Sequence, residues 1–337
     1  MSVEETCRVA SVLQRRFGTR QLKQGGQKML DVESLVAYIR ELSGESNESM
    51  PSALYHYTTA EVLDKLLAED GDLRCTFFRD LNDSAEFWTG FDYFANYCKR
   101  NGSADDCDNC EKVFCNLKEK WGKLQGLYVE APWVASFSTE RDSLYQWVAY
   151  TDRQKGGVAI GFDKAKLEIA IQESSRCHNR KAILLPCFYV KMRKKNDTRP
   201  DAEFVDKKLD DLIKFLLDKI DRDNPNYHQE LETAILIFSS IVKDIVFSAE
   251  HEWRIVVLTT DFASCEGAEV IAGKARLPLG ICEEGKRKVG ELISEIHMSP
   301  HGDQNRLLHS AMLPKFSAPS LKYKIRRSDL PYKGEKS

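Results

Sequence analysis

Three short segments of this 337-residue chain carry ionisable or hydroxyl side chains two positions apart. The segments are LYHYTT, WVASFS and SAEHEWR, at residues 54–59, 133–138 and 248–254. In a β-strand, side chains two apart point to the same face of the sheet. The pairs presented in this way are His56 with Thr58, Ser136 with Ser138, and Glu250 with Glu252. What chemistry these groups can perform depends on whether the three strands meet.

The third segment poses the clearest alternative. Extended geometry aims Glu250, Glu252 and Arg254 at one face. Burying such charges without partners costs on the order of several kcal/mol each. Two interpretations are therefore open. Either this face is exposed to solvent at a sheet edge, where ladders of ion pairs are common, or it opens into a polar cleft.

The other two pairs each have an ordinary interpretation. A histidine between two tyrosines, as His56 is, is more often a packed core residue, and Ser136 and Ser138 suit a half-exposed sheet. Polar pairs on three predicted strands together favour the cleft. We expect His56, Ser136 and Glu252 to converge there, with a tyrosine or tryptophan from residues 145–150 on the wall.

The elements that must position these residues follow from hydrophobic periodicity. Strands are predicted at residues 54–58, 133–138, 158–163 and 252–260, and a strand pair or a kinked strand at 181–192 around Pro186. Helices are predicted at residues 59–70, 141–153, 164–174, 201–222 and 227–243, and over 85–125 with a loop at 100–109. Strand-type runs return near residues 291–299 and 321–332. Because this order lacks a regular β-α-β rhythm, we expect a mixed α+β fold.

The predicted domain organisation has one main unit. Residues 1–50 form an N-terminal helical segment, with amphipathic helices at 3–18 and 31–43, and a polar linker follows. Residues 51–332 form the α+β domain, with helical insertions near 85–125 and 201–243. Residues 333–337 are a tail.

Composition excludes several functions. The formal net charge is −3, with 30% charged residues, which argues against a general nucleic-acid coat or a polybasic membrane anchor but leaves room for a local basic groove. No secretory signal or uninterrupted apolar span is present, so we expect no membrane partner. Ten scattered cysteines in a chain of this size favour a reducing cytoplasm.

Four cysteines crowd together in CKRNGSADDCDNCEKVFC: Cys98, Cys107, Cys110 and Cys115. A Cys-x-x-Cys pair with two flanking cysteines could ligate a structural zinc ion, but the spacing after Cys110 fits no usual zinc motif. We expect reduced thiols without a metal, in a helical insertion away from the cleft.

The order His-Tyr-Thr, Ser-Phe-Ser, Glu-x-Glu resembles the histidine-type branch of the ADP-ribosyltransferase fold. The chain from residue 54 onward also resembles the bacterial family known as domain of unknown function 2971. This second resemblance lies in LYHYTT, LNDSAEF, SFSTERDSLYQWVAY, GGVAIGFD and EHEWRIVV, together with the closing IRRSDLPY. The first resemblance implies a split β-sheet core with helical insertions and NAD as substrate.

The resemblance also implies a role for each site residue. Glu252 would be the catalytic carboxylate, stabilising an oxocarbenium-like transition state as the nicotinamide–ribose bond breaks, and Glu250 would orient or activate the acceptor. Cofactor-binding roles would fall to His56, Tyr57, Thr58, Ser136, Ser138, Tyr145, Tyr150 and Arg254, with Tyr145 or Tyr150 stacking on nicotinamide. The first strand has no arginine, and the Ser-x-Ser element lacks its usual middle threonine.

The expected function is NAD-dependent ADP-ribosyl transfer to a protein or nucleic-acid acceptor, in a bacterial defence or toxin-type setting. One alternative is a non-catalytic nucleotide- or nucleic-acid-binding module that uses His56, Arg254 and the KMRKKN patch on phosphates. Another is RNA 2′-phosphate transfer on a similar scaffold.

Overall fold

The computed structural model describes residues 32–44, 51–82, 86–101, 104–122, 131–178, 180–191, 206–259, 265–281, 289–317 and 321–331. The predicted helix at 3–18, the tail at 333–337 and most of the KMRKKN patch lie outside these residues.

Within the described residues, ten strands form one sheet in the order β12-β11-β4-β1-β3-β2-β10-β9, with β8 and β5 branching from β3. The strands are β1 (Ala53–Thr58), β2 (Arg74–Phe77), β3 (Pro132–Ser138), β4 (Val158–Asp163), β5 (Lys181–Pro186), β8 (Glu252–Leu258), β9 (Glu269–Ile271), β10 (Lys274–Pro278), β11 (Ile293–Met298) and β12 (Lys324–Arg327). The pairing is antiparallel except between β11 and β12. A separate parallel pair joins β6 (Phe188–Val190) to β7 (Val242–Asp244).

The sheet splits along one edge of β3. Its partner at Ser138 is Tyr55 of β1, whereas its partners at Val134 and Trp133 are on β2. Ser136 lies between the two pairings. On the other edge, β8 pairs with β3 along its whole length. The split therefore opens beside Ser136.

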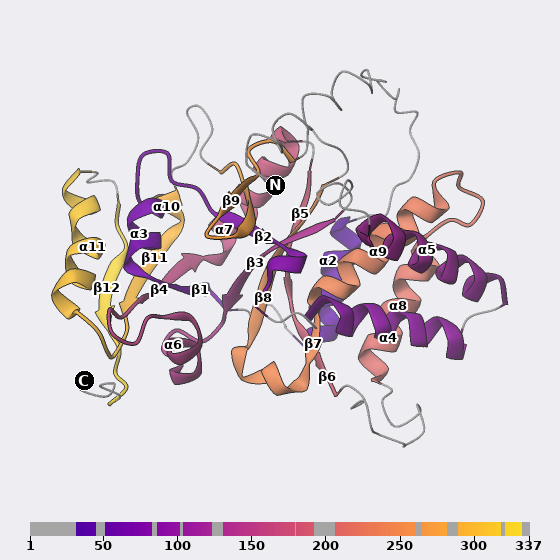
Figure 1. The fold of residues 1–337 in the computed structure, drawn as a ribbon, viewed down its shortest axis with the longest axis horizontal. Coiled ribbons are helices and arrows are strands. Elements are labelled where there is room, and N and C mark those ends of the chain that lie inside the picture. The colour runs from indigo at the N-terminus through magenta and orange to yellow at the C-terminus, as the bar shows by residue number, and fades with distance from the viewer. Residues whose placement is uncertain are drawn as a thin grey trace.

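Helices cover the sheet and both of its ends (Figure 1). One end carries α4 (Glu86–Asn101), α5 (Ala104–Gly122), α8 (Lys207–Lys219) and α9 (Tyr227–Ile241), and the other carries α3 (Ala60–Leu66), α10 (Val289–Leu292) and α11 (Gln304–Ser317). The remaining helices are α2 (Val32–Ser43), α6 (Leu144–Tyr150) and α7 (Lys164–Cys177), with short 3₁₀ helices η1 (Phe78–Asp80) and η4 (Ile245–Glu250).

Strand β8 is an interior strand. It lies between β3 and β5, and all seven of its residues are buried. On one face Lys164 of α7 lies over the Trp253 ring at 4.4 Å, and on the other Arg254 donates to the carbonyl of Ser240 in α9. Because helices cover both faces, β8 reads as a continuous apolar run from residue 255 to 258.

The packing of α4 against α9 depends on a glycine. A Cβ atom at Gly90 would lie 2.7 Å from the Ser239 Cα atom and 3.1 Å from the Val242 Cβ atom. The missing side chain lets α4 approach the end of α9 and the start of β7, where the polar side chains of the site begin.

The predicted mixed α+β class is confirmed, with a mostly antiparallel sheet. The strands at residues 54–58, 133–138 and 158–163 are also confirmed. Asp163 caps helix α7, because its side chain accepts a hydrogen bond from the Lys166 amide at 3.0 Å. The predicted loop at 100–109 is wrong over most of its length, since α5 begins at Ala104. The acidic and polar residues of this segment are typical of turns, and this composition concealed the start of the helix.

Sequence periodicity did not predict β2, β9, β10 or α11. The two short strands β9 and β10 form a hairpin that pairs with β2. Strands of three to five residues give too few alternations for a periodic signal. Among the described helices, none combines the length and apolar character needed to cross a membrane.

Candidate functional site

The Ser-x-Ser and Glu-x-Glu segments lie side by side in the sheet. Ser138 pairs with Glu252, and Ser136 pairs with Arg254. Directly opposed residues of an antiparallel pair share a face, so these four side chains lie on the same face. The structure thus brings together two of the three polar segments singled out by sequence.

Glu250 lies on this face, but its backbone is not in the predicted strand. It ends η4, where Asp244 caps the first turn by accepting from the Val246 amide at 3.0 Å. His251 follows in the left-handed conformation, with φ of 43°, and turns the chain into β8. The prediction that Glu250 is extended is therefore wrong, although its carboxylate still lies beside that of Glu252.

A cluster of four buried charges forms the centre of the site: Lys243, Glu250, Glu252 and Arg254. The Lys243 ammonium donates to Glu250 Oε2 and, at 2.6 Å, to Glu252 Oε2. Arg254 Nε donates to Glu252 Oε1 at 3.0 Å, and its Nη1 donates to the Ser240 carbonyl at 2.7 Å. Two cations and two carboxylates balance, which is what makes burial of all four tolerable.

Uncharged groups fix the position of the two glutamates. The main-chain carbonyl of Glu250 accepts hydrogen bonds from Ser138 Oγ at 2.7 Å and Gln146 Nε2 at 3.1 Å. The hydroxyl of Tyr150 donates to Glu250 Oε1 at 2.8 Å. The amide of Glu252 donates to the Tyr189 hydroxyl at 2.7 Å. Helix α6, strand β3 and strand β6 therefore all hold the carboxylate pair.

The environment moves the pKa values of the two carboxyl groups in opposite directions. Burial raises the pKa of Glu250, the neighbouring carboxylate of Glu252 adds to the rise, and Lys243 opposes it. Burial also disfavours ionised Glu252, but Arg254 and Lys243 outweigh that effect and hold the pKa of Glu252 at about 2. Glu252 is therefore the fixed anion of the pair, and Glu250 is the group poised to take up a proton.

Neither sequence interpretation of this face is correct as stated. The exposed-edge interpretation is wrong because β8 is paired on both sides. The carboxylates also do not lie open, since the side chains of Glu250 and Glu252 are each 5% exposed. The described conformation is a covered, fully paired polar site.

His56 does not join the other predicted residues. Tyr55 pairs with Ser138, so alternation puts Tyr55 and Tyr57 on the face of Glu252 and puts His56 on the opposite one. The His56 ring instead lies 5.8 Å from that of Phe137, and its Nδ1 donates to the Ser136 carbonyl at 2.9 Å beside the split. The predicted convergence of His56, Ser136 and Glu252 on one face is wrong for the histidine. Burial lowers the pKa of His56, so the ring is held neutral.

The remaining residues predicted to bind the cofactor do not all lie beside the carboxylates. Tyr57 lies on the carboxylate face, but its hydroxyl donates to the Glu140 carbonyl at 2.7 Å and its ring packs on Trp147. Thr58, at the end of β1, is buried. Tyr145 is 41% exposed on the outside of α6. Of the two candidate tyrosines, Tyr150 is the one that reaches a carboxylate, since its hydroxyl donates to Glu250 Oε1.

Sequence reasoning missed Lys243, Gln146 and Tyr189. Lys243 carried a signal, since it is a lone cation within the apolar stretch AILIFSSIVKDIVF. A buried lysine in such a run needs an acidic partner, and the Glu-x-Glu segment follows within ten residues. Gln146 and Tyr189 had no comparable signal, because their roles arise from contacts across the fold.

The same sheet face continues away from the carboxylates. Tyr55 reaches across β4 and donates to Glu295 Oε1 at 2.5 Å, passing over Gly161. A Cβ atom at Gly161 would lie 2.8 Å from Tyr55 Cε1 and 3.0 Å from the Glu295 Cγ atom, so a larger residue here would have to displace one of these two side chains. His297 Nε2 faces Glu295 Oε1 at 3.4 Å, and burial lowers its pKa.

One carboxylate joins two of the stretches that carried the family resemblance. Asp142, in SFSTERDSLYQWVAY, accepts from Trp147 Nε1 and from the Ser328 hydroxyl, both at 2.7 Å. Its second oxygen accepts from the amide of Asp329, in IRRSDLPY, at 2.8 Å. These contacts fix α6, and with it Gln146 and Tyr150, against the end of the chain beyond β12.

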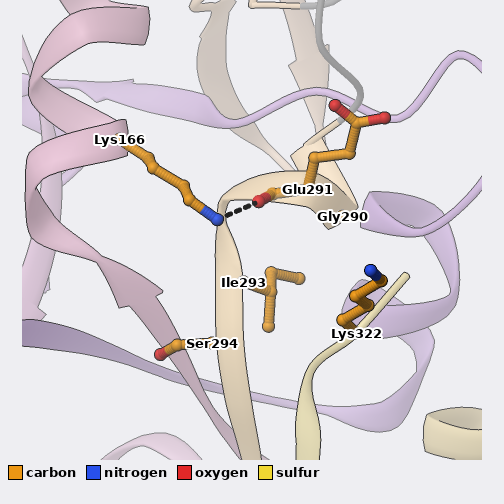
Figure 2. Close-up of a pocket in the computed structure, with 6 residues that line it drawn as sticks. All are labelled: Lys166, Gly290, Glu291, Ile293, Ser294 and Lys322. Atoms are coloured by element: carbon orange, nitrogen blue, oxygen red, sulfur yellow. Dashed lines mark hydrogen bonds between the residues drawn. The ribbon is translucent and has the colours of Figure 1, made fainter. Parts of the chain in front are cut away.

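A shallow hollow of about 350 Å³ lies elsewhere, lined by Lys166, Gly290, Glu291, Ile293, Ser294 and Lys322. Figure 2 shows Lys166 and Lys322 on opposite sides of Ile293, with Lys166 reaching the Glu291 carbonyl at 3.4 Å. None of the predicted site residues lines this hollow. It is therefore separate from the carboxylate cluster.

Comparison with known proteins gives one match. Residues 146–255 match the model of a family described as Protein of unknown function (DUF2971). The matched segment runs from α6 to β8, so it contains Tyr150 and all four charges of the cluster. This supports the family resemblance seen in the sequence. No curated protein and no solved structure matches the chain.

Proposed function

We propose that the chain is an NAD-dependent ADP-ribosyltransferase-like enzyme that breaks the nicotinamide–ribose bond and passes the ADP-ribosyl group to a macromolecular acceptor. A bacterial defence or toxin-type setting belongs to the same proposal. One observation carries it: two adjacent buried carboxyl groups share Lys243, and their pKa values are displaced in opposite directions.

The two carboxyl groups suit the two tasks of this reaction. Cleavage of the glycosidic bond builds positive charge on the ribose, and a permanently ionised Glu252 would stabilise it. Burial raises the pKa of Glu250, and a carboxylate with a raised pKa is the better proton acceptor, so Glu250 would take the proton from the attacking acceptor. Ser138 and Tyr150 would hold Glu250 in place through the contacts described above.

Substrate entry requires movement of the cover. The carboxylates are closed off by α6 and η4, which contact each other and carry exposed apolar side chains at Leu144, Val148 and Val246. In this proposal, the start of η4, which carries Val246, and the outer face of α6 shift apart while Glu250 keeps its hydrogen bond from Tyr150, and the exposed side chains then line the path of the dinucleotide. Lid movements of this kind commonly exclude water from the reacting centre once the substrate is bound.

The test is release of nicotinamide from NAD by the purified chain, with cell extract added as a source of acceptor. Wild type should turn NAD over, and Glu252→Gln should lose on the order of 10²–10³ in rate with little change in NAD affinity, because the charge matters mainly in the transition state. Glu173→Gln, an exposed carboxylate on α7, is the matched control and should behave as wild type.

Two results would count against the proposal. If wild type binds NAD without turning it over, the chain is a nucleotide-binding module, the alternative predicted from sequence. If it neither binds nor cleaves NAD with the acceptor source present, the transferase assignment is wrong.

A further inference from the structure

Two buried sulfur atoms touch between α4 and α5. Cys98 Sγ and Cys110 Sγ are 2.7 Å apart, and each residue is only 2% exposed. Ordinary contact between two sulfur atoms would keep them about an ångström farther apart. Their closeness brings the two sulfur atoms near the length of a disulfide bond, which is about 2.05 Å.

The surrounding helices hold this pair in place. Phe114 of α5 packs edge-on against Phe91 of α4, with ring centroids 4.5 Å apart, and Phe94 packs against Phe238 of α9 at 5.4 Å. Both cysteines therefore lie on helices that are fixed by an aromatic core. Thiols held together in this way react at a high effective concentration.

A third cysteine lies at the edge of the pair. Cys107 is half-buried, and its thiol donates to the Cys98 carbonyl at 2.8 Å. Cys115 is exposed on the same helix. Among the described residues, no cluster of three or more His, Cys, Asp or Glu side chains could hold a metal ion. The metal-free state predicted from the sequence itself stays a prediction, and the geometry favours chemistry between two sulfurs over a shared metal.

We propose that Cys98 and Cys110 are a redox-active pair, which hydrogen peroxide converts into a disulfide joining α4 to α5. One cysteine, as its thiolate, attacks the peroxide oxygen, giving a sulfenic acid and releasing hydroxide. The second thiolate then attacks the sulfenic sulfur, forming the S–S bond and expelling a second hydroxide. The two protons of the thiols convert both hydroxides to water, and the peroxide receives the two electrons.

This modification does not depend on the proposed enzymatic activity. It would close a loop from Cys98 to Cys110 that contains the connection between the helices. A cross-link of this kind restricts the unfolded chain, so the oxidised protein should resist thermal unfolding better than the reduced protein.

The test uses the full chain, first fully reduced and then treated with hydrogen peroxide under native conditions. Thiols are counted after denaturation, and peptides are mapped by mass spectrometry without reduction. Reduced protein should give ten thiols, and oxidised protein two fewer, with one cross-linked peptide pair containing Cys98 and Cys110. The thermal unfolding midpoint should rise on oxidation and return after treatment with dithiothreitol.

Variants separate the pair from its neighbours. Cys115→Ser, the exposed control, and Cys107→Ser should both still form the Cys98–Cys110 bridge. Cys110→Ser should not form it and should lose the oxidation-dependent rise in unfolding midpoint. A wild-type map in which Cys98 is bridged to Cys107, or in which peroxide gives only sulfinic or sulfonic acids at these positions, would overturn the proposal.

Discussion

Glu250 and Glu252 share a single ammonium group. Lys243 donates to both carboxylates, and its side chain is only 3% exposed. Glu252 has a second cationic partner in Arg254, whose Nε lies 3.0 Å from Glu252 Oε1. This asymmetry makes Glu250 the more sensitive member of the pair and leads directly to a test.

Lys243→Met should destabilise the fold by about 3–5 kcal/mol, because it leaves Glu250 buried without a cationic partner. Adding Glu250→Gln removes the uncompensated charge, so the double variant should recover part of the loss. Urea unfolding of the wild type, the two single variants and the double variant measures this coupling. Strictly additive effects would show that the shared ammonium is not what holds the pair together.

The opposite pKa displacements give opposite responses to acid. The pKa of Glu252 is about 2 in the folded chain, below the ordinary value of roughly 4.3. Its contribution to stability is therefore present above the ordinary value and is lost as the pH falls toward 2. The stability difference between wild type and Glu252→Gln should narrow as urea unfolding is repeated from pH 6 down to pH 3.

Glu250 should behave in the reverse sense. Because its pKa is raised in the folded chain, ionised Glu250 costs stability, and the cost is relieved as the pH falls through that raised value. Wild type should thus gain stability relative to Glu250→Gln over the same acid range. If acid changes the stability of wild type in the same sense relative to Glu250→Gln and relative to Glu252→Gln, the two carboxyl groups do not have oppositely displaced pKa values.

Gly161→Ala tests the crossing of Tyr55 over β4. The added methyl group would contact the Tyr55 ring and the Glu295 side chain, and overpacking of this kind costs about 1–3 kcal/mol. In a Tyr55→Ala background the space is open, so the same substitution should cost much less. Thermal unfolding of the four proteins decides this, and an equal cost in both backgrounds would rule out the clash.

The features of the site that could be predicted from the sequence are those set within one strand, and the features that depend on contacts between strands could not be predicted. Alternation correctly placed Ser136 and Ser138 together and correctly separated Tyr55 and Tyr57 from His56. It could not say which of these two faces would meet Glu252, because that depends on the register between β1 and β3, which is set by the whole sheet. The single pairing at Tyr55 and Ser138 decides it.

The backbone conformation at Glu250 could not be predicted from the sequence either. No glycine or proline marks the turn between η4 and β8, since His251 itself adopts the left-handed conformation. Lys243 lies in β7, directly after α9. No periodic pattern in the sequence predicts that its side chain contacts the two glutamates. The charges could be predicted to need partners, but the identity of those partners depends on tertiary contacts.

The hydrogen bond from Tyr150 to Glu250 gives a prediction about catalysis that a purely structural role would not. This bond stabilises the ionised carboxylate and so holds the pKa of Glu250 below where burial alone would put it. Tyr150→Phe removes the bond, and the pKa of Glu250 should rise further. If ionised Glu250 accepts the proton of the attacking group, the acidic limb of the pH profile for NAD turnover should move to higher pH.

Tyr57→Phe is the matched control, since its hydroxyl on the same face donates to the Glu140 carbonyl, and it should leave the acidic limb of the profile unchanged. A Tyr150→Phe enzyme that is slower at every pH by one common factor would show that the tyrosine only positions the helix. In that case Glu250 would not be the proton acceptor.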